Sequence, residues 1–393
     1  MRIAQLSTRY PPGPGGVERH VQEVARRLVV RGHTVTAYAT DLYREFPWER
    51  LPRTVPRTDS DVGVRVRRLP AWSLPGELHY PIVRGLAKAL ADDRPDIVHA
   101  HTYGTHHAAV ARRHARRFRV PFVLTAHYHP IWSIHGGWFR HRLRHFYDHR
   151  LAGPIVGDAS VLVVQSREEE RLIRENGFPL PRVAIVPPGY TPLPAPPAGD
   201  RPFARSIGVD GPILLFVGRL ASNKGLPLLM RAFESLAHHD PTAHLVLVGE
   251  DGGERPGLEG AIRARGLGGR VHLPGFVPDE RLLAAAFREA RLFVLPSEYE
   301  AFGLVLLEAL AQGTPVVASR VGGIPEFVED GRAGRLVEPG DPRALEEAIL
   351  AMWDDPDARA AMGAYGRDTI VPRYRWELVV DALERIYREA SAA

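Results

Sequence analysis

The sequence contains no cysteine, only two lysines among its 51 basic residues, and no long apolar run. The lack of cysteine excludes a disulfide framework, a thiolate metal site and a cysteine nucleophile. No stretch of about 18 consecutive apolar residues occurs, which argues against a membrane-spanning helix. The first sixteen residues also lack the apolar segment of a secretory signal. We therefore expect a cytoplasmic protein.

What the sequence does contain is typical of a soluble chain with large cores. Its 393 residues are 45% hydrophobic and 25% charged, which suits two or three domains and excludes intrinsic disorder. Residues 1–200 carry 29 basic and 18 acidic side chains, whereas the remainder carries 22 and 28. A basic half suits nucleic acid, anionic lipid or a polyanionic ligand. No nucleic-acid motif accompanies this charge, so we expect no nucleic-acid partner.

Short apolar runs alternate with segments of helical periodicity, and the pattern starts again after Pro212. This alternation predicts parallel sheets covered by helices, in two Rossmann-like α/β domains with a cleft between them. In such sheets ligands bind at the carboxyl ends of the strands. The expected strands span residues 2–7, 34–39, 96–101, 121–126, 160–165, 183–186, 213–217, 245–248, 271–273, 292–295 and 316–318.

The first strand-to-helix turn is rich in glycine and proline. Gly15 and Gly16 allow backbone N–H groups to approach an anion at a helix start. The G-x-G-x-x-G dinucleotide fingerprint fails, because counting from Gly13 places Glu18 at its last position. A tight turn without a ligand is an equally good interpretation of this segment.

The turn at residues 216–225 carries two cations at the end of a predicted buried strand, just before a helix. Arg219 and Lys224 together with a helix N-terminus would form a clamp for a diphosphate. The alternative is a pair of solvated surface charges. It is weakened because Lys224 is one of only two lysines in the chain.

Two carboxylates mark the segment at residues 296–310. If the whole segment were helical, Glu300 and Glu308 would lie roughly 12 Å apart. That spacing exceeds the roughly 5–9.5 Å of a glycosidase pair and suits a ligand lying along the helix start. Glu308 stands among apolar neighbours, so it needs a specific partner rather than bulk water.

These turns resemble glycosyltransferase family 4, the retaining group with the GT-B fold that is also described as glycosyl transferases group 1. Further segments match the family in the same order along essentially the whole chain. Pro188 departs from the pattern, because members often carry Asn before the glycine. The matching segments are residues 15–18, 96–101, 125–127, 186–189, 218–225, 248–252, 275–277, 300–308, 311–318 and 321–326, with a late helix from Trp376.

The resemblance implies roles for individual residues on the donor side. Arg219 and Lys224 would bind the nucleotide diphosphate and stabilise it as the leaving group. Glu300 would contact the donor sugar, and Glu308 would accept hydrogen bonds from the ribose hydroxyls. The remaining donor-binding residues implied by the resemblance are Gly218 in the cationic turn, Phe276 and Val277 beside the base, and Phe302, Gly303 and Leu304 around the phosphate.

The resemblance also implies a function and a division of the chain. We expect retaining transfer of a hexose-type sugar from a nucleotide-diphosphate sugar to a hydroxyl of a glycan, glycolipid or small metabolite. No metal or other cofactor is expected, since Arg219 and Lys224 supply positive charge. The alternatives are a GT-B epimerase or hydrolase and a catalytically silent nucleotide-sugar-binding protein. The expected division is an acceptor-side domain at 1–190, a linker at 191–204, a donor domain at 205–372 and a helix at 373–393 that packs back on the first domain.

Two features of the basic half have competing interpretations. The resemblance implies that His127 is a catalytic residue near the donor sugar and the reaction centre. It also implies that Gly15 and Gly16 bind the donor in a loop that closes the cleft from the N-terminal side. Counting His99, His101, His127 and His129 suggests a metal site instead, but there are no carboxylate companions. In the segment 138–150, Phe139, Leu143, Phe146 and Tyr147 share a helical face beside basic residues. It is either a core helix, which we favour, or one that docks on anionic membrane.

Overall fold

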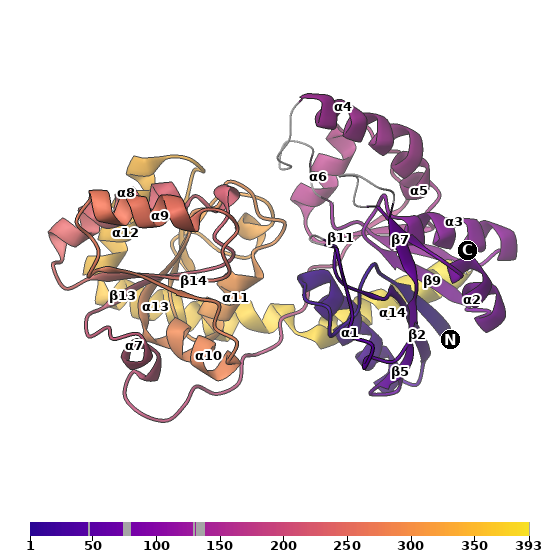
Figure 1. The fold of residues 1–393 in the computed structure, drawn as a ribbon, viewed down its shortest axis with the longest axis horizontal. Helices are drawn as coiled ribbons and strands as arrows, with labels where there is room; N and C mark the ends of the chain where they lie inside the picture. Colours follow the sequence, from indigo (N-terminus) through magenta and orange to yellow (C-terminus); the bar gives the residue numbers. More distant parts are fainter. Residues whose placement is uncertain (46–47, 74–79, 129, 131–137, 393) are drawn as a thin grey trace. The chain divides into compact units, whose positions relative to one another are not determined.

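The computed structural model describes residues 1–45, 48–73, 80–128, 130 and 138–392, and the chain divides into two units. Unit 1 comprises Met1–Gly189 and Trp376–Ala393, and unit 2 comprises Tyr190–Arg375 (Figure 1). Each unit has its own sheet and its own hydrophobic core. This is the predicted α/β class with two Rossmann-like domains.

Unit 1 contains an eight-stranded sheet in the order β12-β11-β10-β9-β1-β2-β6-β5. All neighbours are parallel except the edge pair β5 and β6. The inner strands are continuous apolar runs because helices cover both faces. The strands are β1 (Arg2–Leu6), β2 (Thr34–Thr40), β5 (Thr58–Asp61), β6 (Val64–Leu69), β9 (Ile97–His101), β10 (Phe122–Thr125), β11 (Val161–Val164) and β12 (Val183–Ile185).

The helices of unit 1 come from both ends of the chain. On α1 (Gly16–Val30), Val21, Val24 and Leu28 are buried, as their helical spacing predicts. The other helices are α2 (Leu86–Asp93), α3 (His106–Phe118), α4 (Trp138–Tyr147), the π-helix Asp148–Ala152, α5 (Gly153–Gly157), α6 (Arg167–Glu175) and α14 (Trp376–Ala392). Two small antiparallel pairs complete the unit: β3 (Leu42–Arg44) with β4 (Glu49–Arg50), and β7 (Ala71–Ser73) with β8 (Pro81–Val83).

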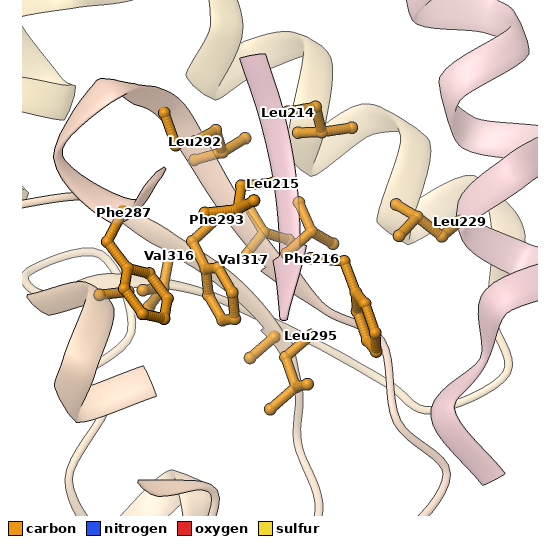
Figure 2. Close-up of a cluster of buried hydrophobic side chains, with 14 of the residues drawn as sticks. Leu214, Leu215, Phe216, Leu229, Phe287, Leu292, Phe293, Leu295, Val316 and Val317 are labelled. Carbon is orange, nitrogen blue, oxygen red and sulfur yellow. The ribbon is translucent and has the colours of Figure 1, made fainter. Parts of the chain in front are cut away.

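Unit 2 is built on a six-stranded, wholly parallel sheet in the order β15-β14-β13-β16-β17-β18. Its core packs the central strands against aromatic rings such as Phe216, Phe287 and Phe293, all fully buried (Figure 2). The strands are β13 (Ile213–Val217), β14 (His244–Val248), β15 (Val271–Gly275), β16 (Ala290–Leu295), β17 (Val316–Ser319) and β18 (Gly334–Val337).

Helices connect the strands of unit 2 and cover its sheet. The α-helices are α7 (Pro202–Ser206), α8 (Leu226–His239), α9 (Arg255–Ala264), α10 (Glu280–Glu289), α11 (Leu304–Ala311), α12 (Pro342–Asp354) and α13 (Pro356–Tyr365). Shorter turns of helix occur at Ser222–Lys224, Ile324–Glu326, Gly366–Ile370 and Val371–Tyr374. None of the helices that the structure describes in either unit is long and apolar enough to cross a membrane.

The chain leaves unit 1 after Gly189 and returns to it at Trp376. These two residues touch, because a Cβ atom on Gly189 would lie 2.3 Å from the Trp376 ring. Beyond Trp376, α14 packs on α1, and in Figure 1 its yellow ribbon lies among the indigo N-terminal elements. The proline-rich segment after Gly189 belongs to unit 2, where Tyr190 and Leu193 enter the core.

Candidate active site

The predicted cationic turn lies at the carboxyl end of β13 in unit 2. After Val217 the chain makes a short turn of helix, Ser222–Lys224, and Gly225 then precedes α8. Gly225 has a φ of +64°, and a Cβ atom on it would lie 2.0 Å from the Pro296 carbonyl oxygen. Only glycine lets this turn pack so closely against the segment that follows β16.

That packing brings Lys224 to Glu300, which is 76 residues further along the chain. The Lys224 ammonium lies 2.5 Å from Oε1 of Glu300, and the Ser297 hydroxyl donates to the same oxygen at 2.8 Å. The side chains of Lys224 and Glu300 are 19% and 13% exposed. The site therefore holds a partly desolvated cation and carboxylate that an incoming ligand can reach. Ser297 was not predicted, since a lone serine leaves no signal in a sequence.

Arg219 supplies a second cation on the same turn. Its side chain is exposed, and its Cγ would lie 3.0 Å from a Cβ atom on Gly252. Within the part of the chain that the structure describes, its guanidinium makes no hydrogen bond or ion pair. It is therefore available for an anionic ligand, as a diphosphate clamp requires.

A third turn supports Glu300 from the carboxyl end of β17. Gly322 has a φ of +54°, and a Cβ atom on it would lie 1.6 Å from the Glu300 carbonyl oxygen. Next to it, the Gly323 N–H donates to the Ala301 carbonyl at 3.2 Å. The turns after β13 and β17 thus both pack on the backbone of residues 296–301, the segment that carries Glu300.

The second carboxylate is placed differently from the sequence prediction. The helix α11 begins only at Leu304, after Gly303 with a φ of +87°, so Glu300 lies in the preceding turn. The 12 Å estimate assumed an unbroken helix from Glu300 to Glu308 and is wrong for that reason. Glu308 itself is half-buried on α11, and Phe302 is buried and stacked on Phe327 with the ring centroids 4.9 Å apart.

The predicted base-side residues follow β15. The Gly249 N–H at the end of β14 donates to the Gly275 carbonyl at 2.9 Å, which ties the two strand ends together. Beyond Gly275, Phe276 is 63% exposed, whereas Val277 packs against the core of unit 2. An exposed aromatic ring on a fixed turn is a suitable stacking surface for a planar ligand group.

The remaining predicted site residues belong to unit 1. Gly15 precedes α1, Gly16 opens it, and both are exposed. Just beyond them, the buried Glu18 carboxylate pairs with Arg9 at 2.8 Å, and its burial raises its pKa. The glycine turn is thus anchored on its inner side and open on its outer side.

His127 lies two residues after β10 and is 8% exposed. Its φ of +44° is unusual for a residue with a side chain, and such strain is common at functional sites. The rings of His20 and His101 lie 5.8 and 5.9 Å from the His127 ring. His20 was not predicted as a site residue, because its place in the helical repeat of α1 is that of an ordinary core residue.

Glu169 is a second residue that was missed beside His127. The carboxylate of this buried residue accepts hydrogen bonds from the Tyr128 N–H at 2.6 Å and the Gln165 N–H at 2.5 Å. Burial raises the pKa of Glu169 to about 7, although both N–H donors oppose the rise. The signal was available, because Ser166 and Glu169 have the spacing of a helix capping box.

Two of the other histidines take part in a buried polar network. The ring of His99 contacts the Tyr387 hydroxyl at 2.7 Å and the Thr125 hydroxyl at 2.8 Å, and His101 contacts Gln5 at 2.7 Å. No group of three or more His, Asp or Glu side chains among the described residues is arranged to hold a metal ion. His129 lies outside the described residues.

The helix α4 buries only part of the apolar face predicted for it, since Tyr147 packs against the core of unit 1. Leu143 and Phe146 are 41% and 58% exposed, and Leu151 in the following π-helix is 54% exposed. Arg144 turns inward instead, where it contacts the Tyr103 hydroxyl and pairs with the buried Asp148 at 2.8 Å. The core-helix interpretation is wrong for these positions, because a buried carboxylate draws the arginine in. The side chain of Phe139 lies outside the described residues.

The fold belongs to the GT-B glycosyltransferases. A sucrose-phosphate synthase from Thermosynechococcus elongatus matches 100% of this chain and 99% of its own, with a TM-score of 0.79 and 26% identity. Anabaena Alr3699/HepE, solved in complex with UDP and glucose, matches 100% of this chain and 99% of its own, with a TM-score of 0.75 and 22% identity.

Family models match both units in sequence. The model described as glycosyl transferases group 1 covers residues 200–369, and the glycosyl transferase 4-like domain covers residues 15–189. A glycogen synthase of Mycobacterium tuberculosis is 32% identical over 99% of this chain and 95% of its own. A D-inositol 3-phosphate glycosyltransferase of Acidothermus cellulolyticus is 31% identical over 100% of this chain and 91% of its own. The chain belongs to the group 1 glycosyltransferases, also called family 4, and is an enzyme of that class.

Proposed function

We propose that this glycosyltransferase moves a sugar, with retention of configuration, from a nucleotide-diphosphate sugar to an acceptor hydroxyl. The observation that carries the proposal is the ion pair of Lys224 with Glu300 across the ends of the paired strands β13 and β16, with the exposed Arg219 on the same turn as Lys224. A departing diphosphate needs fixed positive charge, and Lys224 lies just before α8, whose dipole adds to that charge. Glu300 would bind hydroxyls of the donor sugar, and Glu308 those of the ribose.

Metal-independent chemistry is part of this proposal, because Arg219 and Lys224 supply the charge that a metal ion would otherwise supply. Two Asp-x-Asp triplets occur in the chain, at residues 59–61 and 355–357. The carboxylate of Asp61 is bound by Arg26 at 2.5 Å, and that of Asp355 caps α13. One carboxylate of each triplet therefore already has a protein partner. The epimerase, hydrolase and silent-binder alternatives are not favoured by the glycosyltransferase relatives.

Replacing Lys224 tests the reaction directly. We expect Lys224→Ala to lower kcat by at least about 100-fold, because one fixed charge at a developing anion has an effect of that order. Lys88, the other lysine, is exposed on α2 in unit 1 and provides the matched control, Lys88→Ala. The measurement is release of nucleotide diphosphate from a panel of UDP-, GDP- and ADP-sugars, after thermal-shift screening has identified the donor.

Near-normal turnover by Lys224→Ala would contradict the proposed role of the cationic turn. Loss of activity in Lys88→Ala as well would point to a general loss of folding. Dialysis against EDTA should leave the wild-type rate unchanged, and a rate restored only by added Mg²⁺ or Mn²⁺ would reject metal independence.

We further propose that unit 1 associates peripherally with anionic membrane, which would bring the enzyme to a lipid-linked acceptor. Leu143, Phe146 and Leu151 form an exposed apolar group on α4 and the π-helix, with Arg150 exposed next to Leu151. The one carboxylate of this segment, Asp148, is buried against Arg144. An apolar face with surplus positive charge complements an anionic lipid surface.

Sedimentation with vesicles tests the association. The full chain should pellet with vesicles of 50% phosphatidylglycerol and not with pure phosphatidylcholine, and Phe146→Ser should reduce the pelleted fraction several-fold. Leu378 on α14 is 45% exposed, so Leu378→Ser is the matched control and should pellet like the wild type. Equal pelleting of both variants, or no lipid-dependent pelleting, would reject this docking face.

A further inference from the structure

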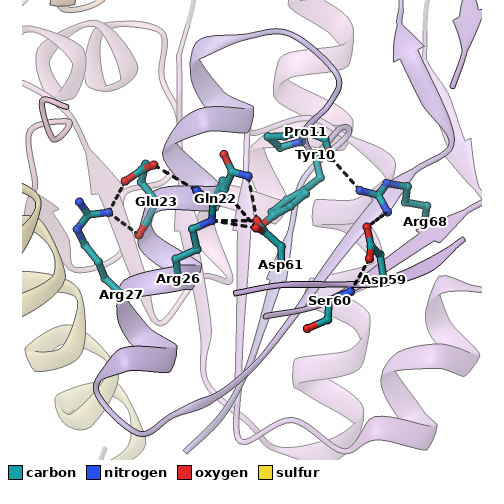
Figure 3. A network of polar contacts seen from close by, with 10 residues as sticks. All are labelled: Tyr10, Pro11, Gln22, Glu23, Arg26, Arg27, Asp59, Ser60, Asp61 and Arg68. Carbon is teal, nitrogen blue, oxygen red and sulfur yellow. Dashed lines mark hydrogen bonds and ion pairs between the residues drawn. The ribbon is translucent and has the colours of Figure 1, made fainter. Parts of the chain in front are cut away.

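A cavity of about 400 Å³ opens in unit 1 outside the predicted site, and several of its lining residues belong to the polar network drawn in Figure 3. One wall is the turn Tyr10–Pro12 that follows β1, and the others come from Gln22 on α1, the loop 54–56, β5 and Arg68 on β6. Its volume lies in the usual range for small-molecule sites. Neither the reaction nor the family resemblance assigns it a role.

The walls of this cavity are held in place by buried polar contacts. Arg68 is 5% exposed and donates to the carbonyl oxygens of Pro11 at 2.8 Å and Pro56 at 3.1 Å, so it joins two opposite rims. On the other side, Asp61 accepts from the Tyr10 hydroxyl at 2.7 Å and the Gln22 amide at 2.9 Å. Such cross-links keep a cavity formed without a ligand, which lowers the cost of binding.

Several polar groups at the wall keep hydrogen-bonding capacity. Asp59 is 43% exposed, but its Oδ2 forms an ion pair with Arg68 at 3.6 Å and its Oδ1 accepts from the Ser60 N–H at 2.7 Å, so this carboxylate is already paired. Within the described ranges, the hydroxyls of Thr54 and Ser60 and the amide oxygen of Gln22 make no hydrogen bond. The groups without a partner are thus an amide oxygen and two hydroxyls, a set that matches a ligand with several O–H groups.

The charge of the walls argues against an anionic ligand. Each cation at this place is paired with a carboxylate, Arg26 with Asp61 at 2.5 Å and Arg68 with Asp59 at 3.6 Å, so the walls hold no surplus positive charge for an anion. The rest of the lining is apolar, from Pro11, Pro12, Val55 and Pro56. Such C–H surfaces pack well against the apolar face of a pyranose ring.

We infer that this cavity is a subsite for a neutral sugar unit, separate from the diphosphate-binding turns of unit 2. As a part of the acceptor-binding surface it rests on the proposed function. The cavity is connected to the predicted site through the backbone, because the turn Tyr10–Pro12 continues in sequence to Gly15 and Gly16 at the start of α1. A sugar held here contacts the same turn that opens α1.

Saturation-transfer NMR on the full chain tests the subsite with defined probes: glucose, galactose, mannose and maltotriose, with glucose 6-phosphate as the anionic comparison. We expect signal from at least one neutral probe, and a weaker signal from the phosphate. Ser60→Trp fills the cavity and should reduce the neutral-probe signal at least about fivefold. Thr58 is exposed on the same strand but does not line the cavity, so Thr58→Trp should leave the signal unchanged.

The outcomes separate this inference from the proposed reaction. Absence of signal from all neutral probes, or equal signals from Ser60→Trp and Thr58→Trp, overturns the subsite. Each variant is also assayed for hydrolysis of the donor in the absence of acceptor. Intact donor hydrolysis without cavity binding rejects the subsite alone, whereas cavity binding in a chain that turns over no nucleotide sugar rejects the proposed reaction alone.

Discussion

Buried histidines give unit 1 a built-in sensitivity to acid. Burial lowers the pKa of His20 to about 4 and that of His99 to about 3, and it takes that of His101 well below its usual value. The three rings lie against one another, with 4.3 Å between the centroids of His99 and His101. Each is therefore neutral in the folded protein at pH 7, and protonation is costly there but not in the unfolded chain.

We predict that stability falls as the pH drops below about 6.5. The unfolded chain binds protons from about pH 6.5 downward, while the folded histidines do not, so each buried ring costs about 2 kcal/mol at pH 5. Glu169 acts in the opposite direction, since its pKa is raised to about 7 and the folded state takes up its proton first. Burial also raises the pKa values of Glu18, Glu45 and Asp148, which act in the same direction as Glu169, whereas it lowers the pKa of His107 to about 4, which adds a fourth ring to the histidines. Between pH 7.5 and 5 we expect the histidines to dominate, because they are the groups that take up protons in the unfolded chain over that range.

Urea unfolding at pH 7.5 and pH 5.0 measures this effect. The free energy of unfolding should be several kcal/mol smaller at pH 5.0, and His99→Gln should reduce the difference by about one histidine's share. A pH-independent free energy of unfolding would show that these rings are hydrated in the folded state.

Some side chains of the candidate site can be predicted from the sequence and others cannot. Lys224 stands out because lysine is so rare in this chain, and Glu300 because a carboxylate recurs eight positions later. Ser297 and His20 do not stand out, since a serine in a turn and a histidine at a core position of a helix are ordinary. Their roles arise from neighbours that are distant in sequence.

At the scale of elements, the burial of a strand decides how well it can be predicted from the sequence. All eleven expected strands are present, because strands buried on both faces read as uninterrupted apolar runs. The strand β6 was missed, since Val64 and Val66 alternate with outward arginines near the sheet edge. Its partner β5 is almost entirely polar, and β18 is only four residues long. Such edge strands lack the signal of a continuous run.

The helix α4 shows why an apolar helical face does not by itself define a core face. Four apolar side chains share one face in the sequence pattern, yet Asp148 at the end of the helix is fully buried. A buried carboxylate needs a cation, and Arg144 is one turn away. Satisfying that charge rotates Leu143 and Phe146 outward, and no periodicity rule includes this competition.

The turn after β17 yields a prediction for backbone geometry. Gly322→Ala should lower kcat at least about tenfold, because its Cβ atom would push the Glu300 carbonyl out of place. Gly331 also has a positive φ, of +76°, but open space around its Cβ position, so Gly331→Ala is the matched control. The strained φ should cost Gly331→Ala about 1 kcal/mol of stability, and Gly322→Ala should lose more, because its Cβ atom also meets the Glu300 carbonyl.

Steady-state kinetics and thermal unfolding of the two alanine variants distinguish the effects. If Gly331→Ala loses as much activity as Gly322→Ala, strain alone would explain the loss and the contact with Glu300 would not matter.

At the scale of the whole molecule, the α/β class follows from sequence physics, while the pairing of distant segments does not. Strand–helix alternation indicates parallel sheets, and the repeat of the pattern after Pro212 indicates two of them. Nothing in the periodicity of residues 376–392 says which sheet they cover; only the family resemblance suggested an answer. In the structure, Trp376, Val380 and Tyr387 enter the same core as Ile3 and Val21.

The difference in charge between the two halves of the chain fits the roles proposed for them. The donor-binding turns lie in the acidic half and rely on a few fixed cations, so the positive excess of residues 1–200 is not needed for the nucleotide. It is instead available for an acceptor or a lipid surface. Such an excess of positive charge attracts an anionic partner from a distance and also contributes to contacts with it once it is bound.

The return of the chain to unit 1 at Trp376 has a consequence for biosynthesis. Unit 2 is one uninterrupted segment and can fold as soon as the ribosome releases residue 375. Unit 1 is synthesised first, but its core lacks Trp376, Val380 and Tyr387 until after unit 2 has emerged. Unit 1 is therefore synthesised first but completed last. A ribosome stalled before residue 376 leaves part of the apolar core of unit 1 uncovered, and chaperones would have to shield it.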